Sequence, residues 1–156
     1  MATRRRRWDP QPSQPAPVLV AATAGQIPTE ALRRAVALSD KSSVAVLSLA
    51  RIHGYAFGLP NPGLLPTRRE ISEHTERVTR ALSVIERAGA TGWGQVAATR
   101  NQARVIARAA RARGARHVVL VTPAQPRWRR VLEGDLLRQV SRKLGSGVTV
   151  ETVTVS

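Results

Sequence analysis

One segment near the end of the sequence constrains the fold more than any other. It covers residues 115–150 and reads ARHVVLVTPAQPRWRRVLEGDLLRQVSRKLGSGVTV. The apolar run at 117–121 predicts a buried strand. Beyond a loop, apolar residues at helical spacing predict an amphipathic helix, with a buried face of Val131, Leu132, Leu136, Leu137 and Val140. Gly145 and Gly147 then lead into a Val- and Thr-rich strand at 148–155, so the segment predicts a strand–helix–strand unit.

The rest of the chain repeats this alternation. Three more strands are predicted by apolar runs, at 18–22, at 43–52 and, more weakly, at 95–99. Helices are expected to begin at three residues that favour a helix start: Pro28, Thr67 and Asn101. Thr67 has capping-box spacing with Glu70, and residues 54–66 form a loop rich in glycine and proline. Strands that alternate with helices favour an α/β fold, with a parallel sheet covered by helices on both faces.

The composition favours one globular domain preceded by a charged tail. Residues 1–17 carry four consecutive arginines and four prolines, so we expect a disordered basic and Pro-rich tail. Residues 18–156 are numerous enough to bury a core and form a single domain. The chain has no cysteine, which excludes disulfides and thiolate metal sites, and it has no apolar run long enough to span a membrane. These features predict a cytoplasmic protein.

Positive charge is the most unusual property of the composition. The net charge is +15, and 23 of the 25 basic residues are arginines. A field of this strength favours association with nucleic acid or another polyanion, with anionic lipid or with acidic proteins. Two groups would make the contact: the tail residues Arg4, Arg5, Arg6, Arg7 and Trp8, and an exposed helical stripe of Arg104, Arg108 and Arg111. A solvated tail and a solvated helix face fit the same pattern, so both interpretations stand.

The order of the elements resembles the universal stress protein (UspA-like) family over residues 18–155. The resemblance rests on the first strand and its turn (VLVAATAGQIPTEAL), on the long helix after the Pro- and Gly-rich loop, on GARHVVLV and on the closing strand–loop–helix–strand segment. It implies a Rossmann-like, adenine nucleotide alpha hydrolase-like fold, whose five parallel strands lie in the order 3-2-1-4-5. It also implies a homodimer that pairs through the last strand.

ATP-binding members of that family carry an aspartate at the end of the first strand and a G-x2-G-x9-G-[ST] pattern after the fourth. The corresponding positions here are Thr23, Val121, Ala124, Gly134 and Asp135, so only Gly134 matches. Side chains at 121 and 124 keep the backbone from a phosphate, and a carboxylate at 135, expected in the first turn of the last helix, would repel one. Pro123 and Pro126 also remove two N–H donors. The resemblance therefore implies a vestigial nucleotide site that does not hold ATP in the usual way.

A different nucleotide site stays open, because Arg127, Arg129 and Arg130 flank the same loop. Their guanidinium groups could hold the phosphates of ATP, AMP or cyclic AMP, or another anion. The same arginines also fit a solvated helix start. The three histidines lie on different elements, with no spacing typical of a metal site or a catalytic triad: His53, His74 and His117. No enzymatic activity, no metal and no resident cofactor are therefore predicted.

The last strand predicts a protein partner. Four of its valines alternate with polar residues: Val148, Val150, Val153 and Val155. The alternation slips by one between Glu151 and Thr152, which indicates a bulge or a change of face. An edge strand with this β-propensity pairs with another strand unless it is covered. We therefore expect a dimer through this strand, although a covered edge in a monomer has the same pattern.

Four functions fit these observations. The leading hypothesis is a non-catalytic universal stress protein-like domain, which acts in the stress response through binding or dimerisation. The second is a sensor that binds an adenine nucleotide through Arg127, Arg129, Arg130 and the loop backbone. The third is an RNA- or ribosome-associated protein that uses the basic tail and the arginine stripe. The fourth is a regulatory domain associated with a membrane transporter, with its tail at the bilayer surface.

Overall fold

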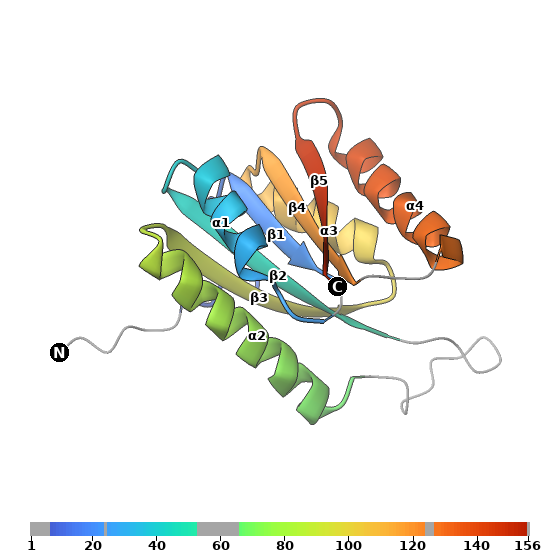
Figure 1. Cartoon of the computed structure of the whole chain (residues 1–156), viewed down its shortest axis with the longest axis horizontal. Helices are drawn as coiled ribbons and strands as arrows, with labels where there is room; N and C mark the ends of the chain where they lie inside the picture. The colour runs from blue at the N-terminus through green and yellow to red at the C-terminus, as the bar shows by residue number, and fades with distance from the viewer. Residues whose placement is uncertain (1–6, 24, 53–65, 124–126, 156) are drawn as a thin grey trace.

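The chain folds into three layers, with a β-sheet between two pairs of helices (Figure 1). The computed structural model describes residues 7–23, 25–52, 66–123 and 127–155, apart from the side chains of Arg51 and of residues 127–135. The elements in chain order are β1 (Val18–Ala22), α1 (Thr29–Leu38), β2 (Ser43–Arg51), α2 (Arg68–Arg87), β3 (Thr91–Thr99), α3 (Gln102–Arg113), β4 (His117–Pro123), α4 (Arg127–Leu144) and β5 (Thr149–Val155). The predicted alternation of strands and helices is confirmed.

The sheet has five strands in the order β3-β2-β1-β4-β5, and every neighbouring pair is parallel. Helices α1 and α2 cover one face, and α3 and α4 cover the other (Figure 1). At the centre of the sheet, Val20 lies between Val46 and Val119, and all three side chains are fully buried. Burial on both faces explains why these strands are short continuous apolar runs. The predicted fold class is therefore confirmed.

Local signals set the ends of the helices. The side chain of Thr67 accepts a hydrogen bond from the N–H of Glu70 at 3.1 Å, as the capping-box spacing predicts. Asn101 caps α3 in the same way by accepting from the N–H of Arg104 at 3.1 Å. At its other end α3 stops at Gly114, whose φ of 65° is left-handed and favours glycine.

Strand β3 begins four residues earlier than the sequence predicts, at Thr91 instead of Gln95. Glycines usually weaken a strand, but Gly92 and Gly94 lie in this one because α2 packs directly on them. A Cβ at Gly94 would lie 2.8 Å from Cγ1 of Val78. The glycines therefore mark a close approach between a helix and the sheet.

The prediction of a tail without buried contacts is wrong for the residues that the structure describes before β1. Arg7 and Asp9 flank a short parallel bridge between Trp8 and Gly94. The N–H of Asp9 donates to the carbonyl of Gly94 at 2.9 Å, and the N–H of Gly94 donates to the carbonyl of Arg7 at 2.8 Å. This segment thus covers the outer edge of β3. Residues 1–6 of the predicted tail lie outside the described residues.

A buried ion pair holds the same segment to α3. Nη1 of Arg113 lies 2.9 Å from Oδ2 of Asp9, and their side chains are 0% and 8% exposed. The Asp9 carboxylate also accepts from the N–H groups of Ser13 and Gln14, each at 2.8 Å. Burial raises the pKa of the Asp9 carboxyl, but these hydrogen bonds and the charge of Arg113 outweigh it, so the pKa is lower than usual. Short-range sequence patterns missed the contact because its partners lie 104 residues apart.

The structure of strand β5 decides between a bulge and a change of face at the break in its alternation. Its ladder with β4 runs without interruption from Thr149 to Val155, so no bulge forms. Val150 packs against the apolar cluster on the α3 and α4 side, whereas Val153 packs against the cluster on the α1 side. The slip in the sequence is therefore a change of face.

Candidate functional site

The carboxyl edge of β1 and β4 is the expected place for a ligand. In the order β3-β2-β1-β4-β5, the chain proceeds from β1 toward one side of the sheet and later returns to β4 on the other. Open α/β sheets bind ligands at such a switch point, beyond the carboxyl ends of the strands. Thr23 follows β1 there, beside Val121 of β4. The structure thus brings together two of the residues predicted for a vestigial nucleotide site.

Both polar groups of Thr23 are used within the sheet. Its N–H donates to the carbonyl of Val121 at 3.1 Å, and its hydroxyl Oγ1 lies 3.3 Å from the same carbonyl oxygen. The Val121 side chain is fully buried in the core. A carboxylate at position 23 would offer a charged acceptor to a ribose, whereas this hydroxyl donates to backbone. The hydroxyl of Thr23 and the side chain of Val121 are therefore both engaged within the sheet and its core.

Helix α4 corrects the predicted place of Gly134 and Asp135. The helix begins at Arg127, so Gly134 is its eighth residue and Asp135 its ninth. The prediction that Asp135 lies in the first turn is wrong, because the helix starts directly after a short connection at 124–126. At this depth each backbone N–H bonds to the carbonyl four residues earlier. Ala124 lies outside the described residues, and Arg127 is placed as the first residue of α4 by its backbone alone.

A histidine of α2 and a serine of β2 form a polar pair between the helix and the sheet. Nδ1 of His74 in α2 lies 2.6 Å from Oγ of Ser48 in β2, and Ser48 is almost fully buried. Burial lowers the pKa of His74, Arg77 lowers it further, and Glu70 and Glu73 act in the opposite direction. The pair attaches α2 to β2. The signal in the sequence was a serine within an apolar strand and a histidine four residues before Val78, on the buried stripe of its helix.

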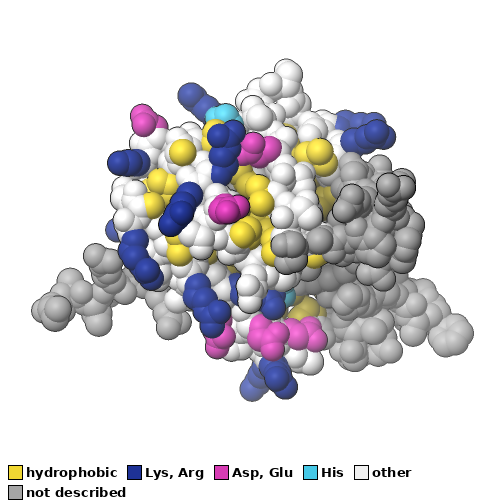
Figure 2. Space-filling view, viewed as in Figure 1, with side chains coloured by type: hydrophobic (Ala, Val, Ile, Leu, Met, Phe, Trp, Pro, Cys, Tyr) yellow, Lys and Arg dark blue, Asp and Glu magenta, His cyan; other side chains and the backbone are white. Residues whose placement is uncertain are grey.

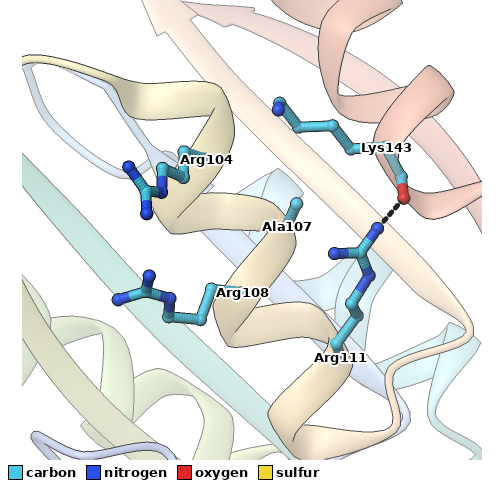
Figure 3. Close-up of a pocket in the computed structure, with 5 residues that line it drawn as sticks. All are labelled: Arg104, Ala107, Arg108, Arg111 and Lys143. Atoms are coloured by element: carbon cyan, nitrogen blue, oxygen red, sulfur yellow. Dashed lines mark hydrogen bonds between the residues drawn. The ribbon is translucent and has the colours of Figure 1, made fainter.

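The predicted arginine stripe on α3 lies at the surface. Arg104, Arg108 and Arg111 are all exposed, as their helical spacing predicts. Together with Ala107 and with Lys143 of α4 they line a depression of about 300 Å³ (Figure 3). In this view Arg104 and Arg108 point the same way, and Arg111 reaches across to α4, where its guanidinium donates to the carbonyl of Lys143. Sequence patterns did not indicate that Lys143 joins the stripe, because it belongs to a different helix.

The other residues predicted to contact a polyanion do not line this depression. Trp8 is half-buried and packs against the core cluster on the α2 side. Arg7 is exposed, and its Cζ lies 5.9 Å from the centre of the Trp93 ring. Arg4, Arg5 and Arg6 lie outside the described residues.

The four valines predicted for a dimer do not form one surface. They are half-buried and lie on both faces of the sheet: Val148, Val150, Val153 and Val155. β5 itself is the last strand of the sheet, and one of its two edges pairs with β4. Pairing with another chain would therefore use the backbone groups of its outer edge.

In the described ranges, no three His, Asp or Glu side chains lie close enough to hold a metal ion. Within those same ranges, no helix is long and apolar enough to cross a bilayer.

Comparison with known proteins supports the fold. No family model and no curated protein matches the sequence. Among solved structures, a universal stress protein from Archaeoglobus fulgidus in complex with dAMP is 21% identical, with a TM-score of 0.55 over 88% of this chain and 96% of that one. Another structure of a universal stress protein from that organism is 19% identical, with a TM-score of 0.58 over 89% and 93%.

A universal stress protein family member from Burkholderia pseudomallei is 18% identical, with a TM-score of 0.60 over 88% of this chain and 95% of that one. The three matches cover 88–89% of this chain, and the strand order of this chain is the one that the resemblance implied. At these identities the likeness is one of fold. The resemblance seen in the sequence is thus confirmed at that level, and this chain has the fold of the universal stress proteins.

Proposed function

We propose that this chain is a non-catalytic, universal stress protein-like binding module that acts in the stress response and does not hold the phosphates of ATP in the usual way. One observation carries the proposal, namely the early start of α4. Residues 124–126 are all that separates β4 from α4, and the backbone at 134 and 135 is helical. Backbone N–H groups inside a helix already have partners and cannot converge on a phosphate.

The described polar groups near the same edge favour a non-catalytic role. The hydroxyl of Thr23 contacts a backbone carbonyl, and His74 is paired with the buried Ser48. A nucleophile needs an adjacent base and an open path to its substrate, whereas Ser48 is only 1% exposed. These groups are better suited to holding the elements together.

Dimerisation through β5 is the second part of the proposal. The outer edge of β3 is covered by the segment around Trp8, so β5 is the strand with an uncovered edge among the described residues. Uncovered edges of this kind pair readily with a second strand. A two-fold axis beside β5 would join two sheets into one and would need no change in either chain.

An adenine nucleoside monophosphate is a second candidate ligand. One of the structural neighbours binds dAMP, and the switch point between β1 and β4 is present here. A monophosphate requires fewer phosphate contacts than ATP, and Arg127 in the first turn of α4 lies near the correct end of the sheet to supply one.

Calorimetric titration of the purified full-length chain with ATP, ADP, AMP, dAMP and cyclic AMP tests both candidates. The first proposal expects no binding of ATP below a Kd of about 1 mM. A Kd for ATP of about 10 μM or tighter would contradict it. The second candidate expects AMP or dAMP to bind in the micromolar range, with a loss of binding in Arg127→Gln. If none of the five nucleotides binds, the second candidate is wrong.

A further inference from the structure

We propose that the face formed by α3 and the end of α4 binds the phosphate backbone of a nucleic acid, without reading its sequence. This binding surface consists of Arg104, Arg108, Arg111 and Lys143 around Ala107. It lies on the helix layer opposite α1 and α2 (Figure 1). The inference goes beyond the proposed function and does not depend on it.

Helix geometry arranges the cations in a row. The arginines are spaced four and three residues apart, so they follow one side of α3 over roughly 10 Å. Ala103 and Ile106 lie on the buried side of the same helix. Ala107 lies between the arginine row and α4, and its small side chain leaves room for the depression of about 300 Å³. A row of this length fits successive phosphates of a chain better than one small anion.

Little negative charge is available to neutralise the four cations of this surface. From residue 87 to residue 132 the sequence contains ten arginines and no Asp or Glu. None of the described carboxylates forms an ion pair with the four cations. On the opposite face, by contrast, basic and acidic side chains are interleaved (Figure 2). Among the described residues, the exposed arginines of α3 thus lack the ion-paired carboxylates that accompany Arg34 and Arg69 on the opposite face.

One contact holds part of this surface ready for a ligand. The guanidinium of Arg111 donates to the carbonyl of Lys143 near the end of α4, which ties the two helices together. A guanidinium has five N–H donors, so most of those of Arg111 remain for an anion. Fixing the side chain beforehand reduces the entropy lost when the ligand binds. Arg111 is therefore held in place before a ligand binds.

The chemistry of the surface favours nucleic acid over a membrane. Guanidinium groups bind phosphate oxygens in a bidentate manner, and three of the four cations are arginines. Peripheral membrane helices insert large apolar or aromatic side chains beside their cations. The apolar residue that lines the depression is an alanine. Without an aromatic platform in the depression, base stacking adds nothing, so we expect binding that is independent of sequence.

The test measures the affinity of the full-length chain for fluorescent nucleic acids over a range of salt concentrations. The probes are single-stranded RNA of about 20 nucleotides, DNA of the same sequence and its duplex. The variant Arg104→Gln/Arg108→Gln removes two cations from the surface. The control Arg68→Gln/Arg80→Gln removes the same charge from exposed positions on α2.

Each lost phosphate contact on a single strand lowers the salt slope by about 0.7. The α3 variant should therefore lower the slope by about 1.4 and weaken binding about 25-fold at 0.1 M salt. The α2 control should leave the slope unchanged. The probe that binds most tightly shows whether the phosphate backbone recognised is that of RNA or of DNA, and either result supports the proposal.

Three outcomes would overturn the proposal. Equal weakening in both double variants would mean that net charge alone attracts the probe. Tighter binding to phosphatidylserine vesicles than to any nucleic acid, lost in the α3 variant, would assign the surface to a membrane. Competition by inorganic phosphate at concentrations near the affinity for the nucleic acid would assign it to a single anion. Thermal unfolding of each variant checks that it folds, since all four positions are exposed.

Discussion

Arg113 of α3 and Asp9 of the N-terminal segment form an ion pair of 2.9 Å, and both side chains lie almost entirely away from solvent. Nη1 of Arg113 also donates to the carbonyl of Gln14 at 3.1 Å, and the N–H of Ala16 donates to the carbonyl of Arg113 at 3.0 Å. A segment that precedes the domain in the sequence is therefore part of the domain in space.

Asp9→Ala should strongly destabilise the fold, because it leaves a buried guanidinium without its counterion. Breaking a buried pair by removing one partner costs about 3–5 kcal/mol. The free energy of unfolding, measured by urea denaturation, should fall by that amount. Arg104→Ala is the control, since it removes an exposed arginine from the same helix and should change stability by less than about 0.5 kcal/mol. A loss below about 1 kcal/mol for Asp9→Ala would mean that the pair opens in solution.

Removing Asp9 should also change how stability depends on acid. The pKa of Asp9 is lower in the folded chain than its ordinary value of 3.8, so its stabilising effect is present above that value. The effect is lost as the pH falls through the folded pKa. Unfolding free energies measured from pH 6 to about pH 2 should therefore decline less steeply in Asp9→Asn than in the wild type. Parallel curves would contradict the assignment.

Much of the fold could be predicted from local patterns, and the exceptions share a physical cause. The buried strands and the caps at Thr67 and Asn101 depend on residues close in sequence. The start of β3 and the docking of Asp9 depend on distant partners, Val78 and Arg113 respectively. Periodicity and turn propensity contain no information about such partners, so both features were missed.

The candidate site was predictable to a smaller extent. Thr23 and Val121 do meet at the switch point, and the arginines of α3 do lie at the surface. The position predicted for Asp135 was wrong because it rested on the family pattern, whereas α4 begins eight residues earlier, at Arg127. Lys143 and the pair of His74 with Ser48 required the packing of separate elements, which only the three-dimensional arrangement supplies.

His74 should make stability sensitive to mild acid. Its pKa is lowered from 6.5 by burial, so the unfolded chain binds a proton at a higher pH than the folded one. Stability is therefore full above about pH 6.5 and is lost as the pH falls from there toward the folded pKa. The difference in unfolding free energy between wild type and His74→Gln should shrink as the pH is lowered from about 7.5 to 5. A difference that stays constant over this range would show that His74 is not buried in solution.

Gly94→Ala should destabilise the contact between β3 and α2. The new Cβ would lie 2.8 Å from Cγ1 of Val78, a β-branched side chain with little freedom to move. Overpacking of this kind costs about 1–3 kcal/mol. Gly147→Ala is the control, because a Cβ there meets nothing within 4 Å. The two variants are compared by thermal unfolding, and equal midpoints would show that α2 does not approach the strand as closely as described.

Thr152→Lys should weaken the proposed dimer. Thr152 is exposed near the middle of β5, so a two-fold axis beside the strand would bring two lysines close together. Like charges opposite each other destabilise paired strands. Sedimentation equilibrium should show a dimer dissociation constant raised about tenfold, equivalent to about 1.4 kcal/mol. Ser146→Lys adds the same charge in the exposed turn before β5 and should leave association unchanged. A wild-type chain that stays monomeric at about 100 μM, or equal effects of the two lysines, would show that β5 is not the interface.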